Sequence, residues 1–363
     1  MKIEIRLKEV LQGYGLDRHG IVQDIARALD LHRHTIQRLY NNEMTNPPLD
    51  VLGRVCDYLI ERGVPQEVLP QALFGARPAE IWKALLCEKK VTMYLGEYEK
   101  LDEPVPTRRW ISRRDASVAT QMIERLSRAQ EHQRPQVHIE YVSFRFNAQD
   151  PSVTAEEVFL DDKKHASEVF KQMRGRPKGE AAVLIGSQRV NYLTEHFVAD
   201  LFGCEPFPEP ANRSNVPFFL IYRSYDRVVS SCFGGAELPG GQGTPVPGVY
   251  YRDEKGKWAC CPWVLNERDG GIVIVVYDPR NQDIELALLG FSGRGTTAIG
   301  TQLVHNAHQF WPPYADHRGR SVGVYICEMT FVQTGQAGRD ETLHLRTFKP
   351  IQLSPAILKK HLS

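Results

Sequence analysis

The sequence predicts a helical N-terminal module followed by an α/β domain with a mainly parallel sheet. Residues 1–75 carry apolar side chains at the 3.6-residue spacing of amphipathic helices. Beyond residue 89, short apolar runs typical of strands alternate with helical segments, which is the pattern of a sheet covered by helices. Two of these runs end in a glycine-containing turn before a helix, as parallel strands often do.

Composition sets few limits on function. The chain has 363 residues, of which 42% are hydrophobic and 25% charged, so it can bury ordinary cores in two or three domains. Its net charge of +1 gives no overall attraction to nucleic acid. Seven scattered cysteines indicate reduced thiols. Because neither a long apolar run nor a signal peptide is evident, we expect a cytoplasmic protein that does not enter a membrane.

Residues 21–29 predict the first of two crossing helices. Its apolar side chains recur on one face, namely Ile21, Ile25, Ala26 and Leu29. Ala26 is small enough for another helix to cross closely. Asp30 can adopt the left-handed conformation that a three-residue corner requires.

A second helix is predicted to begin at His32, with Ile36 and Leu39 buried. Its remaining side chains are hydrogen-bonding groups without a carboxylate, namely His32, Arg33, His34, Gln37 and Arg38. Residues 1–75 hold nine lysines or arginines and ten acidic residues, so affinity for DNA must come from this local cluster. We expect Arg33, His34 and Gln37 to reach base edges, and Arg38 to contact phosphate.

These residues resemble the Cro/repressor (Xre-like) helix-turn-helix family over about residues 3–63. The matching positions are Ala26, Leu31, Ile36, Leu39, Asn41 and, in the following segment, Asn46, Pro47, Leu49, Leu52, Val55, Cys56 and Leu59. Two positions depart from the family pattern: Asp30 replaces the usual glycine, and Val22 replaces a common glutamine. The resemblance implies a transcriptional regulator that binds double-stranded DNA through Gln23, His32, Arg33, His34, Thr35, Gln37, Arg38 and Asn41. A helical bundle with solvated charges is the alternative.

Three domain boundaries are predicted. A closing helix over residues 64–75 ends the DNA-binding domain at Gly75, residues 76–88 form a linker helix, and residues 89–363 form the α/β domain, with a subdivision near residue 180. Expected strands lie at 90–99, 137–146, 181–187, 217–223, 271–278, 284–293 and 322–331. Because a DNA-binding module of this kind commonly addresses two half-sites, we expect a homodimer on an inverted-repeat operator.

Two strand-to-helix turns in the α/β domain predict a ligand crevice. One lies at residues 186–187 and the other at 290–296. Neighbouring parallel strands end at the same sheet edge, where helix N-termini favour anions. The predicted ligand-binding residues are Gly186, Ser187, Asn191, Gly290, Ser292, Gly293, Arg294, Gly295 and Thr296. The alternative is that these glycines serve only the tight turns.

The segments IGSQRVN and GFSGRGT are similar to parts of Rossmann-like nucleotide-sensing domains, and this similarity implies a nucleotide or another phosphorylated small molecule. We therefore expect a regulator whose DNA binding responds to a small anionic, nucleotide-like ligand.

Other candidate groups predict neither a metal site nor a cofactor. Cys260 and Cys261 are adjacent and cannot reproduce a C-x-x-C pair, and His305 and His308 have no carboxylate beside them. Glu195 is a minor catalytic candidate. In the absence of a compelling acid, base or nucleophile cluster, a nucleotide- or NAD-processing enzyme fused to the DNA-binding module is the second hypothesis, and an oligomerisation domain is the third.

Overall fold

The fold divides into two units, Met1–Ala79 and Glu80–Ser363, in a computed structural model. The structure describes residues 5, 7–41, 43–44, 47–64, 69, 73, 81–100, 109–128, 134–146, 155–208, 215–224, 230–239, 245–278, 280–281, 283–311, 314–315, 319–334 and 342–362.

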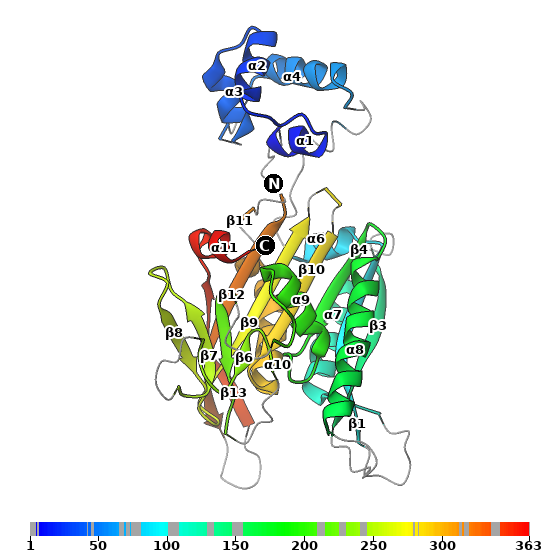
Figure 1. The fold of residues 1–363 in the computed structure, drawn as a ribbon, viewed down its shortest axis with the longest axis vertical. Coiled ribbons are helices and arrows are strands. Elements are labelled where there is room, and N and C mark those ends of the chain that lie inside the picture. The colour runs from blue at the N-terminus through cyan, green and yellow to red at the C-terminus, as the bar shows by residue number, and fades with distance from the viewer. Residues whose placement is uncertain are drawn as a thin grey trace. The chain divides into compact units, whose positions relative to one another are not determined.

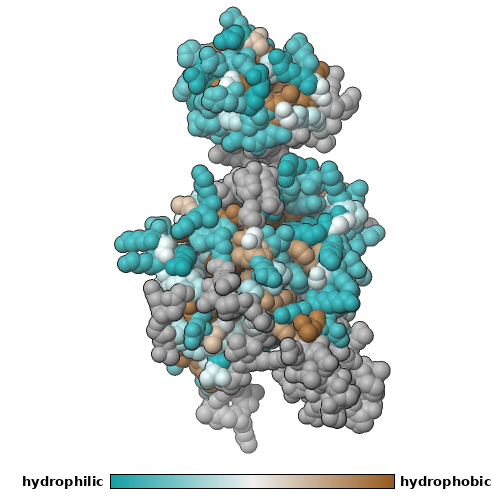
Figure 2. Space-filling model, in the orientation of Figure 1, coloured by the Kyte–Doolittle hydropathy of each residue, from teal (hydrophilic) through white to brown (hydrophobic). Residues whose placement is uncertain are grey.

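The N-terminal unit is helical throughout its described elements (Figure 1). These are α1 (Leu7–Gly13), α2 (Ile21–Ala28), α3 (Arg33–Tyr40) and α4 (Leu49–Glu61). They enclose one apolar core, and the surface visible in Figure 2 is predominantly hydrophilic. In the expected closing helix, Leu69 and Leu73 are helical and buried, whereas Gly75 lies outside the described residues.

The C-terminal unit is built on a large mixed sheet. Its main path runs β11-β12-β9-β10-β4-β1-β2, while β13 pairs with β12 and β3 pairs with β1. The strands are β1 (Lys90–Lys100), β2 (Arg109–Ile111), β3 (Gln136–Phe146), β4 (Glu180–Ile185), β9 (Arg268–Asp278), β10 (Asp283–Gly290), β11 (Tyr314–Ala315), β12 (Ser321–Thr334) and β13 (Thr342–Gln352).

The α/β architecture is confirmed, and parallel pairing is confined to one half of the sheet. Strands β3, β1, β4 and β10 are mutually parallel neighbours, whereas β9, β12 and β13 continue the sheet in antiparallel order. The antiparallel half arises because β9 and β10 form a hairpin, and so do β12 and β13. Short connections of this kind can join only antiparallel strands.

Helices cover both faces of this sheet (Figure 1). One face packs against α6 (Ile81–Cys87), α7 (Arg113–Ser127) and α10 (Gly293–Asn306), and the other against α8 (Ala155–Arg174) and α9 (Tyr192–Phe202). Strand β4 is apolar because both of its faces are buried: Ala181 and Val183 enter one core, and Ala182 and Leu184 enter the other.

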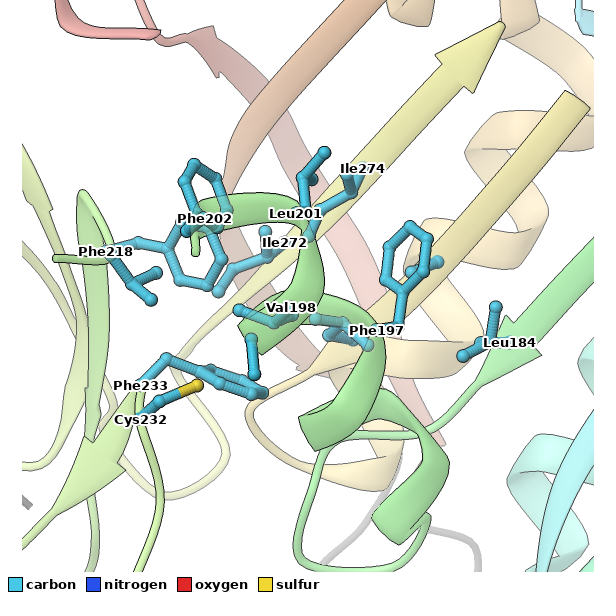
Figure 3. Close-up of a cluster of buried hydrophobic side chains, with 14 of the residues drawn as sticks. Leu184, Phe197, Val198, Leu201, Phe202, Phe218, Cys232, Phe233, Ile272 and Ile274 are labelled. Carbon is cyan, nitrogen blue, oxygen red and sulfur yellow. The ribbon is translucent and has the colours of Figure 1, made fainter. Parts of the chain in front are cut away.

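A second sheet of four strands, in the order β6-β5-β7-β8, lies beside α9. Its strands are β5 (Phe218–Ile221), β6 (Gly234–Gly235), β7 (Gly248–Arg252) and β8 (Trp258–Pro262). Figure 3 shows Val198 and Phe202 of α9 beside Phe218 and Phe233 of this region, whereas Phe197 of the same helix lies toward Leu184 of β4. The helix is therefore buried almost all round, as its nearly continuous apolar sequence requires.

Helix α6, expected to be part of a linker, belongs to the core of the C-terminal unit. Trp82 is buried, and its indole Nε1 donates a hydrogen bond to the carbonyl oxygen of Leu303 at 3.0 Å. The chain ends in the short helix α11 (Pro355–His361), which packs on the other core. Among the described residues, no helix is both long and apolar enough to span a membrane.

Candidate functional site

The corner between α2 and α3 has the expected geometry. Asp30 adopts a positive φ of 49°, and the N–H of Leu31 donates to the carbonyl oxygen of Ala26 at 2.9 Å. Ala26 is buried against the crossing helix, and Ile36 and Leu39 are fully buried below it. An aspartate serves at the corner because its short polar side chain tolerates the left-handed conformation better than most residues do.

Helix α3 begins at Arg33, one residue later than predicted, because His32 is its N-cap. The imidazole Nδ1 of His32 accepts a hydrogen bond from the backbone N–H of His34 at 3.2 Å. A side chain in this position satisfies a donor that has no partner inside the helix. One ring nitrogen of His32 is therefore engaged in capping, and only the other is available to DNA.

The outward face of α3 is polar and accessible. Arg33 and His34 are exposed, whereas Thr35 and Gln37 are half-buried. The amide Nε2 of Gln37 donates to Oδ1 of Asn41 at 3.2 Å, which orients both side chains on one helical face.

Two further contacts continue this polar row beyond the helix. Asn41 Nδ2 donates to Oε1 of Glu43 at 3.0 Å, and Arg38 Nη2 donates to the carbonyl oxygen of Glu43 at 3.4 Å. Glu43 thus contacts Arg38 through its backbone and Asn41 through its carboxylate at the end of α3, just beyond the residues 32–38 in which the sequence showed no carboxylate.

The remaining DNA-binding residue, Gln23, is exposed on α2, while Val22 packs partly into the core. In the segment after α3, Leu52, Val55 and Leu59 are buried. Leu49, also part of the matching signature, is 85% exposed, and Asn46 lies outside the described residues.

The arrangement of α2, α3 and the following helix α4 identifies this unit. Residues 6–62 match the Cro/C1-type HTH DNA-binding domain. The N-terminal unit is therefore a DNA-binding domain of the helix-turn-helix class, as found in transcription regulators. No curated protein and no solved structure matches the chain.

In the C-terminal unit, the two predicted loops lie together. Strands β4 and β10 are parallel neighbours with Ile185 opposite Leu288, so both end at the same sheet edge. The N–H of Gly186 donates to the carbonyl oxygen of Leu288 at 3.0 Å. A hollow of about 240 Å³ is lined from both loops, including Ser187 on one side and Ser292 on the other. The crevice expected from strand order is present.

Six of the nine predicted ligand-binding residues line this crevice: Ser187, Gly290, Ser292, Gly293, Arg294 and Thr296. The other three have internal roles. Asn191 is fully buried and caps α9 through Oδ1, while its Nδ2 donates to two backbone carbonyl oxygens. Gly186 forms the turn with a φ of 101°, and the N–H of Gly295 is already hydrogen-bonded. The polar groups described for Gly186, Asn191 and Gly295 are therefore engaged within the protein, contrary to the prediction that these residues bind a ligand.

The N-terminus of α10 is closed by side chains of the protein itself. The buried Asp269 carboxylate accepts from the N–H of Gly295 at 3.0 Å and from the Ser292 hydroxyl. The Ser292 oxygen in turn accepts from the N–H of Arg294 at 3.1 Å. Because these donors are satisfied, an anion in this crevice would be held by side-chain charge, and the expectation that the N-terminus of α10 attracts the anion through its N–H groups is wrong for Arg294 and Gly295.

That charge comes chiefly from arginines that were not among the predicted ligand-binding residues. Arg114 lies in the first turn of α7, Arg189 lies in the 186–190 loop, and Arg223 follows β5. They are far apart in the sequence, so only the fold brings them together. For Arg189 a signal was present, since it stands three residues after Gly186 in the same turn.

Aromatic rings hold two of these arginines. The Arg223 guanidinium lies 5.0 Å from the centroid of the Trp263 ring, and that of Arg189 lies 5.6 Å from the Tyr222 ring. Both distances are within the range of cation–π attraction. The guanidinium groups therefore have defined positions in the crevice, and Trp263 lines it.

Two buried carboxyl groups also face this region. Asp115 is buried beside the 186–190 loop, and burial raises its pKa to about 6, while a hydrogen bond from Ser112 acts in the opposite direction. Burial likewise raises the pKa of Asp269, against the hydrogen bonds that favour its charged form. The desolvation of both groups results from the apolar strands around them.

Gly290 and Gly293 of the second loop are glycines for different structural reasons. A Cβ on Gly290 would lie 2.1 Å from the backbone nitrogen of Thr296, so this glycine is required by the tight turn. A Cβ on Gly293 would meet only the flexible side chain of Arg114, with Cδ at 2.5 Å. The turn-only interpretation thus accounts for Gly290, whereas Gly293 keeps the arginine-lined surface open.

Glu195, the minor catalytic candidate, has a structural role. Glu195 is fully buried and accepts from the Ser231 hydroxyl at 2.6 Å and from the N–H groups of Cys232 and Phe207 at 2.6 and 2.9 Å. This carboxylate fixes the Phe207 loop, whose φ is 53°, and it does not line the crevice.

Neither the histidines nor the paired cysteines form a metal cluster among the described residues. All seven cysteines are free, and burial raises the pKa of Cys261 to about 12. Cys261 therefore behaves as a buried thiol.

Proposed function

We propose that the protein is a sequence-specific transcriptional regulator whose DNA affinity is set by a small anionic ligand in the C-terminal crevice. The proposal that a ligand binds here rests on the charge of this crevice. Five arginines and three carboxylates line its two polar hollows, and the Asp269 carboxylate is already engaged by internal donors. A site of this composition favours a phosphorylated compound over a neutral one.

The DNA part rests on α3. Arg33 and His34 are exposed at its first turn, and Gln37 is oriented by Asn41, so these side chains are placed to meet base edges in a major groove. A homodimer would present two such helices to an inverted repeat. A ligand can alter DNA affinity only to the extent that it binds one arrangement of the dimer better than another.

The deciding experiment is a gel shift with the DNA upstream of the protein's own gene. The change of Arg33 and Gln37 to alanine together should abolish the specific shift, since each lost base contact costs about 1–3 kcal/mol. The matched control is Arg54→Ala on α4, which should retain the shift. Specific binding that survives the double change, with an unaltered thermal melt, would refute DNA reading by α3.

A second function is supported by Asp115. A buried carboxyl group with a pKa of about 6 in a charged crevice is suited to proton transfer near neutral pH. The enzyme hypothesis therefore places Asp115 as acid or base toward a bound nucleotide. Product analysis after incubation with nucleotides tests it, and Asp115→Asn should abolish any turnover.

A further inference from the structure

The crevice is longer than the two loops that predicted it. The hollow beside Ser187 shares Arg223, Ser292 and Gly293 with a second hollow of about 200 Å³. That second hollow shares Arg114 and Arg294 with a third, of about 300 Å³. Because consecutive hollows are lined by some of the same side chains, they lie next to one another, and we treat them as one crevice. Their combined volume falls within the roughly 300–1,000 Å³ usual for small-molecule sites.

The two ends of this crevice differ in chemistry. At one end lie Arg189 and Arg223, each held over an aromatic ring. At the other end the third hollow is lined by Phe331, Leu343 and Leu345 and by Thr297 and Thr301. The two threonine hydroxyl groups donate to the carbonyl oxygen of Gly293 and to Oε1 of Gln121, so their oxygens remain as acceptors. A ligand that fills the crevice must therefore be anionic over one part and apolar or planar over the other.

Arg114 and Arg294 lie between these ends. Both arginines line the second and the third hollow, so their side chains are neighbours. Burial and, after it, the charge of Arg294 lower the pKa of the Arg114 guanidinium, while the charge of Asp269 acts in the opposite direction. Two nearby guanidinium groups repel each other, and a phosphate between them would remove this repulsion. Arg223 borders both polar hollows and so offers a further guanidinium group to a second phosphate.

We propose that the crevice binds a nucleoside di- or triphosphate, with its base beside Phe331 and Leu345 and its phosphate chain along Arg294, Arg114 and Arg223. This inference rests on the proposed ligand-binding function and names its ligand class. A single phosphate would meet only part of the arginine row, and a base would replace water on the apolar wall while its polar edge meets the threonine hydroxyls.

Calorimetric titration of the full-length protein without DNA tests the proposal. The probes are the diphosphates of adenosine, guanosine, cytidine and uridine, the matching monophosphates and nucleosides, inorganic pyrophosphate, and a dinucleotide with a single phosphodiester. At least one diphosphate should bind ten-fold or more tightly than its monophosphate and than pyrophosphate. Equal affinity of the monophosphate, exclusive binding of the dinucleotide, or binding of none of the diphosphates would overturn it.

Variants separate the two ends of the site. Arg294→Ala should weaken the diphosphate and pyrophosphate alike by ten-fold or more, whereas Leu345→Ser should weaken the diphosphate alone. Arg128→Ala, at an exposed position after α7, is the matched control and should change neither. If Leu345→Ser leaves diphosphate affinity unchanged in a folded protein, the base does not lie beside Leu345 and the proposal fails.

The regulatory proposal is judged separately, by gel shifts with and without the bound diphosphate. Tight binding without any change in DNA affinity would leave the ligand class intact and refute regulation. A change in DNA affinity caused by another anion, with no nucleotide bound, would refute the ligand class and leave regulation intact.

Discussion

The carboxylate of Asp269, at the start of β9, accepts a hydrogen bond from the backbone N–H of Gly295 at the start of α10, at 3.0 Å. This contact joins the antiparallel half of the sheet to the helix that borders the crevice. It also fills the position at the helix N-terminus that a ligand anion would otherwise take. The crevice is thus lined by arginines, and the Asp269 carboxylate beside them is already hydrogen-bonded within the protein.

We predict that Asp269→Ala lowers the free energy of unfolding by at least about 2 kcal/mol, because it leaves buried donors without partners at about 1–3 kcal/mol each. Urea denaturation measures the effect. Ser292→Ala, which removes one hydroxyl from the same cluster, is the milder comparison and should cost less. An Asp269→Ala protein as stable as the wild type would show that the cap is not formed.

Gly290 and Gly293 should respond differently to the same change. Gly290→Ala places a Cβ 2.1 Å from a backbone nitrogen, and we expect a loss of about 3 kcal/mol or more in stability. Gly293→Val meets only the mobile end of Arg114, so the thermal melt should change little while ligand affinity falls. The two measurements are a melting curve and a titration; a reversed pattern would contradict this assignment of the two glycines.

Ligand binding should depend on pH through Asp115, which shares its hollow with Arg189 and Arg223. Protonation of a carboxyl group with a pKa of about 6 removes a negative charge, so an anion should bind more tightly as the pH falls from 7 to 5. The probe is pyrophosphate, corrected for its own ionisation by a parallel titration of Asp115→Asn. This variant should show only the pH dependence that comes from pyrophosphate itself, and identical pH profiles of the two proteins would exclude Asp115 as the group responsible.

The same carboxyl group should affect stability. Because its pKa rises from 3.8 in the unfolded chain to about 6 in the fold, its contribution is fully present below pH 4 and is lost as the pH rises through 6. Above pH 7, Asp115→Asn should therefore stabilise the fold, by at most about 3 kcal/mol. Urea denaturation at pH 5 and 8 measures the difference, and a larger gain at pH 5 would have the wrong sign.

His32 has two separable roles in the Cro/C1-type domain. His32→Ala removes the N-cap of α3 and should cost about 1 kcal/mol of stability, whereas His32→Ser restores a capping oxygen and should cost less. Both variants lack the imidazole and should weaken DNA binding. Gel shifts and melting curves measured in parallel test this, and full DNA affinity in His32→Ser would show that the ring contacts no DNA.

We also expect the full-length protein to be a dimer on DNA. Sedimentation velocity at micromolar concentration, with and without an operator duplex, measures this. A complex containing one protein chain per duplex would contradict the proposed inverted-repeat mode.

Features that depend on residues close together in the chain could be predicted from the sequence. The spacing of Ile25, Ala26, Ile36 and Leu39, with Asp30 at the corner, fixed the helix-turn-helix because each helix buries a face that its own period defines. The strands β4 and β10, each followed by a glycine turn, likewise predicted the shared sheet edge, because parallel neighbours end on the same side.

The charge of the crevice, by contrast, depends on contacts between distant parts of the chain. Arg114, Arg189, Arg223 and Arg294 come from four separate segments, and no local pattern relates them. The donors of α10 were predicted to be free because Asp269, on another strand, could not be seen as their partner. Asn191 was predicted to bind ligand for the same reason. Its amide donates to the carbonyl oxygen of Tyr94 on a different strand, and such a distant partner of a buried polar group is not visible in the sequence.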